Sequence, residues 1–112
     1  MTVQEITEAL DLTIYTAGAG MEREIEGGYV SDLLSDVMGF AREGEVWITL
    51  QSHVNVVAIA SLKELAAIIL VKDIKPGEAV LEKAEEEGIP VLGTGEETFV
   101  IGGKLFQLLN GE

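Results

Sequence analysis

Polar side chains that could bind a small ligand gather in one segment, Gln51-Ser52-His53, with Thr49 just before it and Asn55 just after it. The apolar run that precedes the segment favours a strand, and Val54 to Ala60 favours a helix. The free amides and positive dipole end of a helix N-terminus attract anions. One interpretation is therefore a phosphate or carboxylate site. The other is that Ser52 caps the helix, Gln51 and Asn55 hold the loop, and His53 is solvated.

Two more polar groups follow predicted strands, Lys72-Asp73 and Gly93-Thr94-Gly95. Ligands of open parallel sheets bind where the carboxyl ends of the strands meet. We therefore expect the second group to contribute Thr94 to the same site. The candidate ligand-binding residues are Thr49, Gln51, Ser52, His53, Asn55 and Thr94.

The sequence predicts no catalytic residues, no metal site and no cofactor. His53 is the only histidine, cysteine is absent, and no Gly-x-Ser-x-Gly motif occurs. Catalytic zinc generally needs two or three His or Cys ligands. Asp32 and Asp36, four residues apart, would share a helical face and could hold a hard cation or form an acid–base pair, although this spacing usually marks a solvated face. The run Glu85-Glu86-Glu87 should point into water at a helix C-terminus.

The first half of the chain predicts a helix, a strand and a second helix before the strand that contains Trp47. Thr2-x-x-Glu5 is a capping box that opens the first helix, with Ile6, Ala9 and Leu10 buried, and a strand follows around Leu12 to Tyr15. Gly27-Gly28 predicts a turn with positive φ. Ser31 or Asp32 would cap the next helix, and its buried positions would be Leu33, Leu34, Val37 and Met38.

The second half alternates strands and helices with short connections. Ala67 to Val71 is an unbroken apolar run of the kind found in strands buried on both faces, and Val91 to Gly93 forms the next strand. Pro76 suits the start of the helix between them, and Gly88 its end. Thr94-x-x-Glu97 predicts a capping box for a C-terminal helix with Phe99, Leu105, Phe106, Leu108 and Leu109 on its apolar face.

This alternation predicts an α/β fold, a three-layer α/β/α sandwich with a mostly parallel sheet. A chain of 112 residues fits one domain spanning 1–112. Trp47 serves the core or an interface, and Tyr29 is the second candidate interface residue.

The charge and composition restrict the partners. The net charge of −13 repels phosphate backbones and anionic lipids, so we expect neither nucleic acid nor membrane as a partner. The absence of cysteine fits a reducing compartment, and the N-terminus lacks the basic start and apolar stretch of a signal peptide. We therefore expect a cytoplasmic protein, most simply a homodimer.

Three segments resemble the DRTGG domain family, and the whole chain is similar to a stand-alone member. They are Gly27 to Asp32, Val46 to Ala58 and Glu87 to Leu92. The segment Gly20 to Ile25 also resembles the start of the N-terminal domain of HPr kinase, which implies a shared fold. The family occurs as an accessory domain of CBS-domain pyrophosphatases and some phosphotransacetylases. The resemblance therefore implies regulation rather than catalysis.

The chain departs from the pattern that names the family. Gln51-Ser52-His53 stands where Gly-Asp-Arg is usual, and Val71-Lys72-Asp73 stands where Thr-Gly-Gly is expected. A ligand that depends on those residues in other members cannot be assumed here. Two functions follow: a non-catalytic sensor of a small anionic metabolite or nucleotide at the loop after the central strand, or an adaptor that binds a metabolic or redox enzyme without a small ligand.

Overall fold

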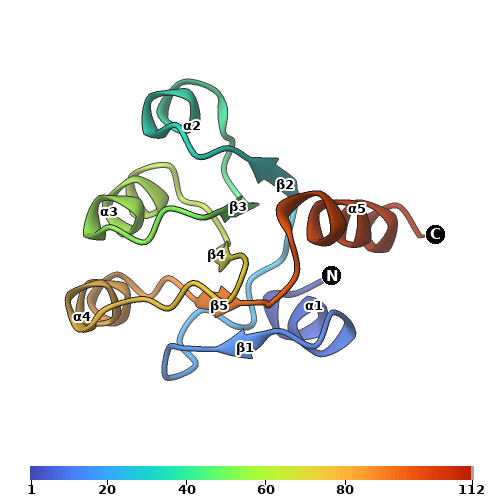
Figure 1. Ribbon diagram of the computed structural model, residues 1–112, viewed down its shortest axis with the longest axis horizontal. Coiled ribbons are helices and arrows are strands. Elements are labelled where there is room, and N and C mark those ends of the chain that lie inside the picture. Colours follow the sequence, from blue (N-terminus) through green and yellow to red (C-terminus); the bar gives the residue numbers. More distant parts are fainter. Residues whose placement is uncertain (112) are drawn as a thin grey trace.

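The computed structural model describes residues 1–111 and contains a five-stranded sheet with helices on both faces (Figure 1). The strand order is β1-β5-β4-β3-β2, and only the β1–β5 pair is antiparallel. The three-layer α/β/α sandwich with a mostly parallel sheet is confirmed. In chain order the elements are α1 (Val3–Ala9), β1 (Thr13–Ile14), β2 (Gly27–Val30), α2 (Leu34–Phe40), β3 (Glu45–Thr49), α3 (Val54–Leu62), β4 (Ala67–Leu70), α4 (Glu78–Glu87), β5 (Val91–Gly93) and α5 (Thr98–Leu109).

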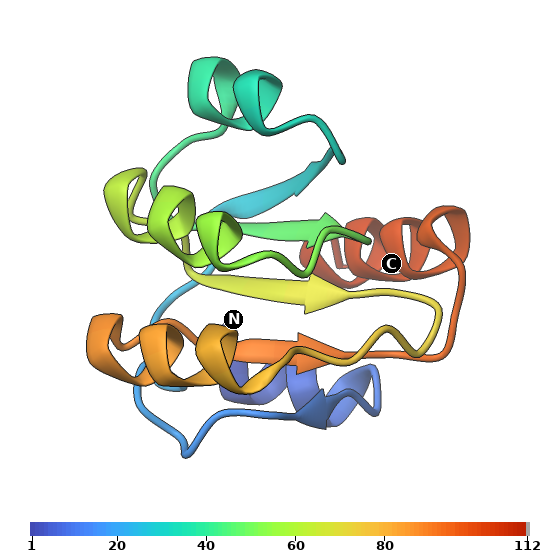
Figure 2. The ribbon, with the colours of Figure 1, turned by 60° about the vertical axis from the view of Figure 1, so that its left-hand side comes forward.

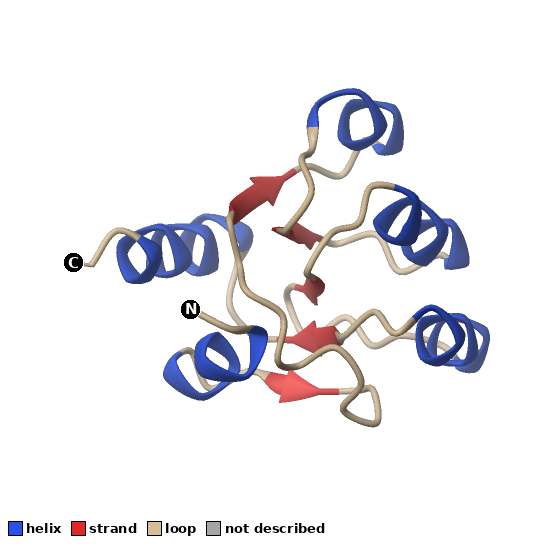
Figure 3. Ribbon diagram, turned by 180° about the vertical axis from the view of Figure 1, so that it is seen from behind, coloured by secondary structure: helices blue, strands red, loops and turns tan. Residues whose placement is uncertain are grey.

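The connections between the parallel strands decide which helices cover which face. Strands β2 to β5 lie side by side in sequence order, and each is joined to the next through a helix. Right-handed crossovers place those helices, α2, α3 and α4, on one face (Figure 2). Helices α1 and α5 cover the other face (Figure 3).

The apolar core lies in two layers, one on each face of the sheet. Val46, Ile48 and Ile69 point into the layer under α1 and α5, whereas Trp47, Ile68 and Leu70 point into the layer under α2, α3 and α4. Because β4 is covered on both faces, every one of its residues is buried, as its unbroken apolar run predicts.

Several predicted helix boundaries are confirmed. The Thr2–Glu5 capping box is present in full, and Gly88 ends α4 in the left-handed conformation with φ +67°. In α1, however, the buried residues are Val3, Ile6 and Thr7, and Ala9 is exposed.

Other predicted boundaries are wrong. Gly27 and Gly28 do not form a turn with positive φ but begin β2, where both pair with β3. α5 packs close to this strand, since a Cβ on Gly28 would stand 3.2 Å from Cδ2 of Leu105. Helix α5 begins at Thr98 rather than beside Thr94, whose hydroxyl accepts a hydrogen bond from Glu96 N, two residues on. The glycine pair Gly102-Gly103 leaves α5 unbroken.

Helix α2 begins at Leu34 without a side-chain cap. Ser31 Oγ accepts a hydrogen bond from Leu33 N instead, and Leu33 and Met38 are exposed rather than buried. The prediction of an acidic run directed into water at the end of α4 is also partly wrong. Glu85 Oε2 accepts from Ala17 N at 2.7 Å, and Glu87 accepts from the Ser61 hydroxyl.

Candidate functional site

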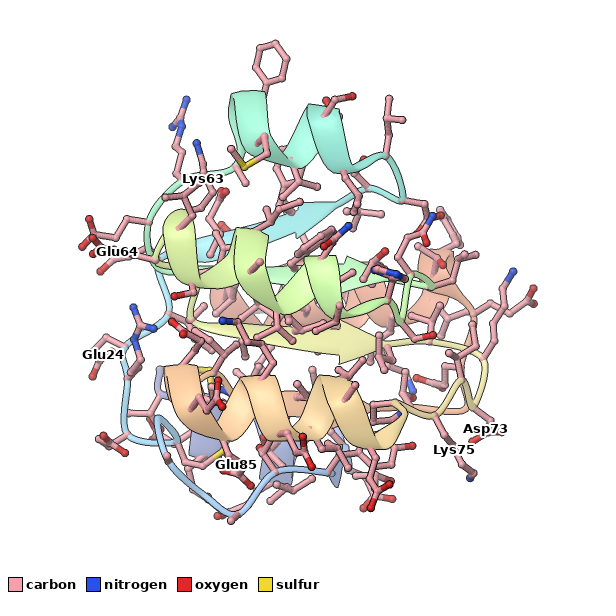
Figure 4. All side chains as sticks on the ribbon, turned by 90° about the vertical axis from the view of Figure 1, so that its left-hand side faces the viewer. Glu24, Lys63, Glu64, Asp73, Lys75 and Glu85 are labelled. Carbon is pink, nitrogen blue, oxygen red and sulfur yellow. The ribbon has the colours of Figure 1, made fainter. Side chains whose placement is uncertain are left out.

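The loops that follow β2, β3, β4 and β5 meet at one edge of the sheet, as parallel strands require. Figure 4 shows this edge from the side of α2, α3 and α4, with Asp73 and Lys75 on the loop after β4 and Glu24 and Glu64 at the opposite edge. The candidate residues therefore lie at the edge where we expected them. Their contacts divide them into two groups.

Asp32 links the loop after β2 to the loop after β3. Its Oδ1 accepts hydrogen bonds from the Thr49 hydroxyl at 2.9 Å and from Leu50 N at 2.8 Å. Its backbone carbonyl accepts from Gln51 Nε2 at 3.0 Å, and Gln51 N donates to the Thr49 hydroxyl at 3.1 Å. Thr49 and Gln51 are therefore occupied in holding the loop, which agrees with the structural interpretation of these two residues.

Asp32 and Asp36 do not share a helical face, because α2 begins only at Leu34. Asp36 accepts a hydrogen bond from the Tyr29 hydroxyl at 2.9 Å instead. Desolvation raises the pKa of Tyr29 above 10.0, and the Asp36 hydrogen bond and charge raise it further. The side chains of Asp32 and Asp36 both accept hydrogen bonds from other residues of the chain. That Asp32 holds the loop after β3 was not predicted from the sequence.

His53, and not Ser52, is the N-cap of α3. Its Nδ1 accepts a hydrogen bond from Asn55 N at 3.2 Å, which leaves Nε2 as the N–H of a neutral ring. Within residues 1–111, no hydrogen bond involves the Ser52 hydroxyl, the Asn55 side-chain amide or His53 Nε2. These atoms of the three residues are free for a ligand, and so, among the described residues, is Gln51 Oε1, because Gln51 uses only Nε2 and its backbone N–H in the loop.

Thr94 lies at the same edge, directly after β5, and β4 lies between β5 and β3. Its carbonyl accepts from Asp73 N at 3.0 Å, and Glu96 O accepts from Lys72 N at 3.0 Å. These bonds hold the loops after β4 and β5 together. Gly95 allows the close approach, because a Cβ there would stand 3.0 Å from Asp73 Oδ2.

The two candidate interface residues lie beneath α2. The Trp47 side chain is fully buried, and its indole N–H donates to Ser31 O at 2.8 Å. Tyr29 is half-buried beside it. Trp47 therefore belongs to the core of this chain. It can support an interface only indirectly, by positioning the residues of α2.

A hollow of about 390 Å³ lies away from this edge, between β2 and α5. Apolar side chains and glycines form most of its wall, with two carboxylates at its mouth. The lining includes Glu26, Gly28, Val30, Glu45, Leu105 and Phe106. The outer side of α5 continues the apolar surface, because Phe99 is 91% exposed and Phe106 is 65% exposed. Sequence reasoning placed both phenylalanines on the apolar face of this helix and did not find the hollow.

The comparison with protein families decides what kind of domain this is. The model of the DRTGG domain matches residues 5–108. The chain belongs to the DRTGG domain family. No curated protein matches it.

A solved structure with the same fold is the CBS and DRTGG regulatory region of Clostridium perfringens pyrophosphatase, in complex with the activator diadenosine tetraphosphate. The TM-score is 0.68 at 16% sequence identity, and the match covers 94% of this chain and 45% of that chain. The present chain thus corresponds to less than half of that regulatory region.

The two departures of this DRTGG domain from the family pattern lie in the loops after β3 and β4. Lys72 and Asp73, at the expected Gly-Gly positions, adopt left-handed φ values of +58° and +59°. The backbone therefore takes the conformation that favours glycine, although neither residue is a glycine.

Among the described residues of this DRTGG domain, the candidate site supplies groups that can bind a ligand, and His53 has no hydrogen-bond partner that it could activate as a nucleophile. The only side-chain hydrogen bond of His53 within residues 1–111 is to a backbone amide, so neither an acid nor a hydroxyl is hydrogen-bonded to the ring there. The described residues contain no group of three or more His, Cys, Asp or Glu side chains that could hold a metal ion. None of the helices described is long and apolar enough to cross a membrane.

Proposed function

We propose that this DRTGG domain is a non-catalytic, cytoplasmic regulatory protein that binds an enzyme of metabolism or redox chemistry through the outer surface of α5. The observation that carries the proposal is the exposure of Phe99 and Phe106 on the same helix, on a chain whose surface is otherwise strongly acidic. Large exposed apolar side chains that adjoin one another mark interaction sites. The pyrophosphatase structure with the same fold is the regulatory region of its enzyme, and this supports a regulatory function.

Pull-down from native cells tests the proposal. We expect the unmodified domain to retain one enzyme reproducibly, and the double variant Phe99→Ala, Phe106→Ala to lose it. Leu62→Ala is the matched control, because Leu62 is also an exposed apolar residue but lies on α3, on the other face of the sheet. Equal capture by both variants would contradict the proposal.

A second candidate function is the sensing of a small anionic metabolite or nucleotide at the start of α3. The free polar atoms of Ser52, His53 and Asn55 beside the helix N-terminus favour it. The pyrophosphatase region with the same fold holds diadenosine tetraphosphate, which makes that nucleotide a rational first probe.

Thermal unfolding with diadenosine tetraphosphate, ATP, AMP and inorganic phosphate tests this second function. A ligand at 100 times its Kd stabilises the folded state by about 2.7 kcal/mol, which shifts the melting temperature measurably. His53→Asn removes the imidazole and keeps a good N-cap, so it should abolish the shift without unfolding the protein. No shift with any of the four compounds would rule out these ligands.

We also propose a homodimer formed through α2. This helix exposes Phe40, which is 70% accessible, together with Met38. Sedimentation of the unmodified chain should give twice the monomer mass, and Phe40→Glu should give the monomer. A monomer in both cases would contradict the dimer.

A further inference from the structure

The lateral edge of the sheet, formed by β2, offers unused backbone hydrogen-bonding groups. It is distinct from the edge at which the carboxyl ends of the strands meet. β2 is the last strand of the sheet and pairs only with β3. Ser31 N, at the end of β2, donates to Ile48 O on β3 at 3.3 Å. Because alternate residues of a strand face the same neighbour, Tyr29 also faces β3, and the N–H and C=O groups of Gly28 and Val30 face outward. Such an edge is a template for one more strand.

The hollow between β2 and α5 opens beside this edge. The side chain of Val30, which is 52% exposed, and the position that a side chain on Gly28 would occupy lie on the α5 side of β2. Gly102 on α5 faces Val30, with 3.7 Å between its Cβ position and Val30 Cγ2. Small residues on both walls thus leave room for side chains from an added strand, since residues of that strand would alternate between the two faces of the sheet.

The charges around this edge determine which kind of segment can bind there. Glu26 and Glu45 line the hollow, and Asp36 lies on the opposite face of the same edge, where it contacts the Tyr29 hydroxyl. Within residues 1–111, none of these three carboxylates forms an ion pair. These carboxylates attract a basic segment to this edge, and they repel a second copy of the chain that would bring its own carboxylates to the same edge.

We propose that an extended segment of a partner protein, with alternating apolar and basic side chains, adds as a strand to the open edge of β2. Its backbone pairs with Gly28 and Val30, its apolar side chains enter the hollow beside α5, and its basic side chains meet the surrounding carboxylates. This inference rests on the proposed function, because it names the segment by which a protein partner is held.

A library of linear 12-residue peptides displayed on phage, selected on the immobilised full-length chain, tests the proposal. We expect enrichment of sequences that alternate apolar residues with Lys or Arg. A synthetic peptide of the enriched sequence should bind more weakly as salt rises. In its complex, amide hydrogen exchange at Gly28 and Val30 should slow at least tenfold. Enrichment of acidic peptides, or protection elsewhere than at β2, would overturn the proposal.

Val30→Pro isolates the backbone contact. Proline removes the outward N–H of Val30, which β3 does not use, and proline is tolerated on an edge strand. We expect at least a tenfold loss of affinity for the enriched peptide, whereas Val30→Thr keeps the N–H and the side-chain shape and should lose less than threefold. Circular dichroism confirms that both variants are folded. If Val30→Pro is not folded, the exchange rates at Gly28 and Val30 in the unmodified chain decide the question.

Glu26→Gln isolates the charge contact. It should weaken peptide binding and reduce its salt dependence, while Glu86→Gln, on the exposed side of α4, should change neither. Equal effects of the two substitutions would contradict the basic partner. A homodimer that Val30→Pro dissociates would show that a second copy occupies the edge, which also overturns the proposal.

The outcomes separate this inference from the proposed function. If the Phe99, Phe106 double variant loses the cellular enzyme and Val30→Pro retains it, partner binding through α5 stands and strand addition is wrong. If Val30→Pro loses the cellular enzyme and the Phe99, Phe106 double variant retains it, strand addition stands and the proposed enzyme contact through α5 is wrong.

Discussion

Asp32 is the residue on which the order of the loop after β3 depends most. Its carboxylate accepts two hydrogen bonds, from the Thr49 hydroxyl and from Leu50 N. Bonds to a charged acceptor are stronger than neutral ones, so we expect Asp32→Ala to lower the free energy of unfolding by about 1–2 kcal/mol. Asp32→Asn keeps one oxygen acceptor and should lose less. Urea denaturation measures both, and a negligible loss for Asp32→Ala would show that these bonds add little.

Lys72 is held in a backbone conformation that its side chain disfavours. Its φ of +58° lies in the left-handed region, which glycine adopts without a Cβ penalty. We expect Lys72→Gly to raise the free energy of unfolding by up to about 1 kcal/mol, measured by urea denaturation. Lys75→Gly is the matched control, because Lys75 is equally exposed and has no positive φ, so that change should destabilise. Destabilisation of the same size by both would contradict this account of Lys72.

Glu87 connects α4 to α3 and should respond to pH. The hydrogen bond from the Ser61 hydroxyl and then the charge of Lys83 hold the pKa of Glu87 below its ordinary value of 4.5. A lowered folded-state pKa means that the contribution of Glu87 to stability is present above pH 4.5 and is lost as pH falls through the folded-state pKa. Ser61→Ala should raise the pKa of Glu87 toward 4.5 in a carboxyl NMR titration. Ser35→Ala, which removes an exposed hydroxyl on α2, should leave it unchanged.

The position of the candidate ligand residues could be predicted at the residue scale, but most of their contacts could not. Polar residues directly after an apolar strand indicate the carboxyl edge of a sheet, and this placed Gln51 and His53 correctly. The role of Asp32 could not be predicted, because it depends on β2 lying beside β3. The interpretation in which Ser52 caps the helix is wrong, because the imidazole Nδ1 of His53 does the capping.

At the scale of elements, replacing a glycine should lower the free energy of unfolding in β2 and raise it in α5. A Cβ on Gly28 would press on the buried Leu105, so we expect Gly28→Val to lower the free energy of unfolding by about 1–3 kcal/mol. Gly103 is exposed in the middle of α5 with nothing within 4 Å of its Cβ position, so Gly103→Ala should raise it by about 0.5–1 kcal/mol. Thermal and urea unfolding measure both. A stabilising Gly28→Val would mean that α5 can shift away from β2.

Elements with a strong local signal were predictable, and those that depend on neighbours were not. The apolar run of β4 and the capping box of α1 each carry their own signal, so both predictions are confirmed. β2 has the sequence Gly-Gly-Tyr-Val, whose first half has poor strand propensity, and its strand conformation comes from pairing with β3 and packing against α5. The start of α5 was misplaced because Thr94 forms a local turn that resembles a cap in sequence.

At the scale of the whole molecule, charge and apolar surface are distributed unequally. The acidic side chains give a net charge of −13, and the described residues form only three ion pairs, all at least partly exposed. Exposed pairs of this kind contribute little to stability. The apolar residues at the surface of α5 and β2 stand out against this background, and the same charge that opposes self-association through that surface favours a basic partner.

The net charge also predicts how the folded state responds to salt. Repulsion among like charges is stronger in the compact state than in the unfolded chain, and 0.5 M salt screens it at distances beyond a few ångströms. We expect the melting temperature at pH 7 to rise between 10 mM and 0.5 M NaCl by several degrees, since about 1 kcal/mol corresponds to roughly 4–8 °C in a domain near this size. The triple variant Glu22→Gln, Glu82→Gln, Glu86→Gln removes three exposed carboxylates and changes the net charge from −13 to −10. It should melt higher at low salt and gain less from added salt, which separates charge screening from a general salt effect on apolar burial. A melting temperature that falls with salt would show that attractive pairs outweigh the repulsion.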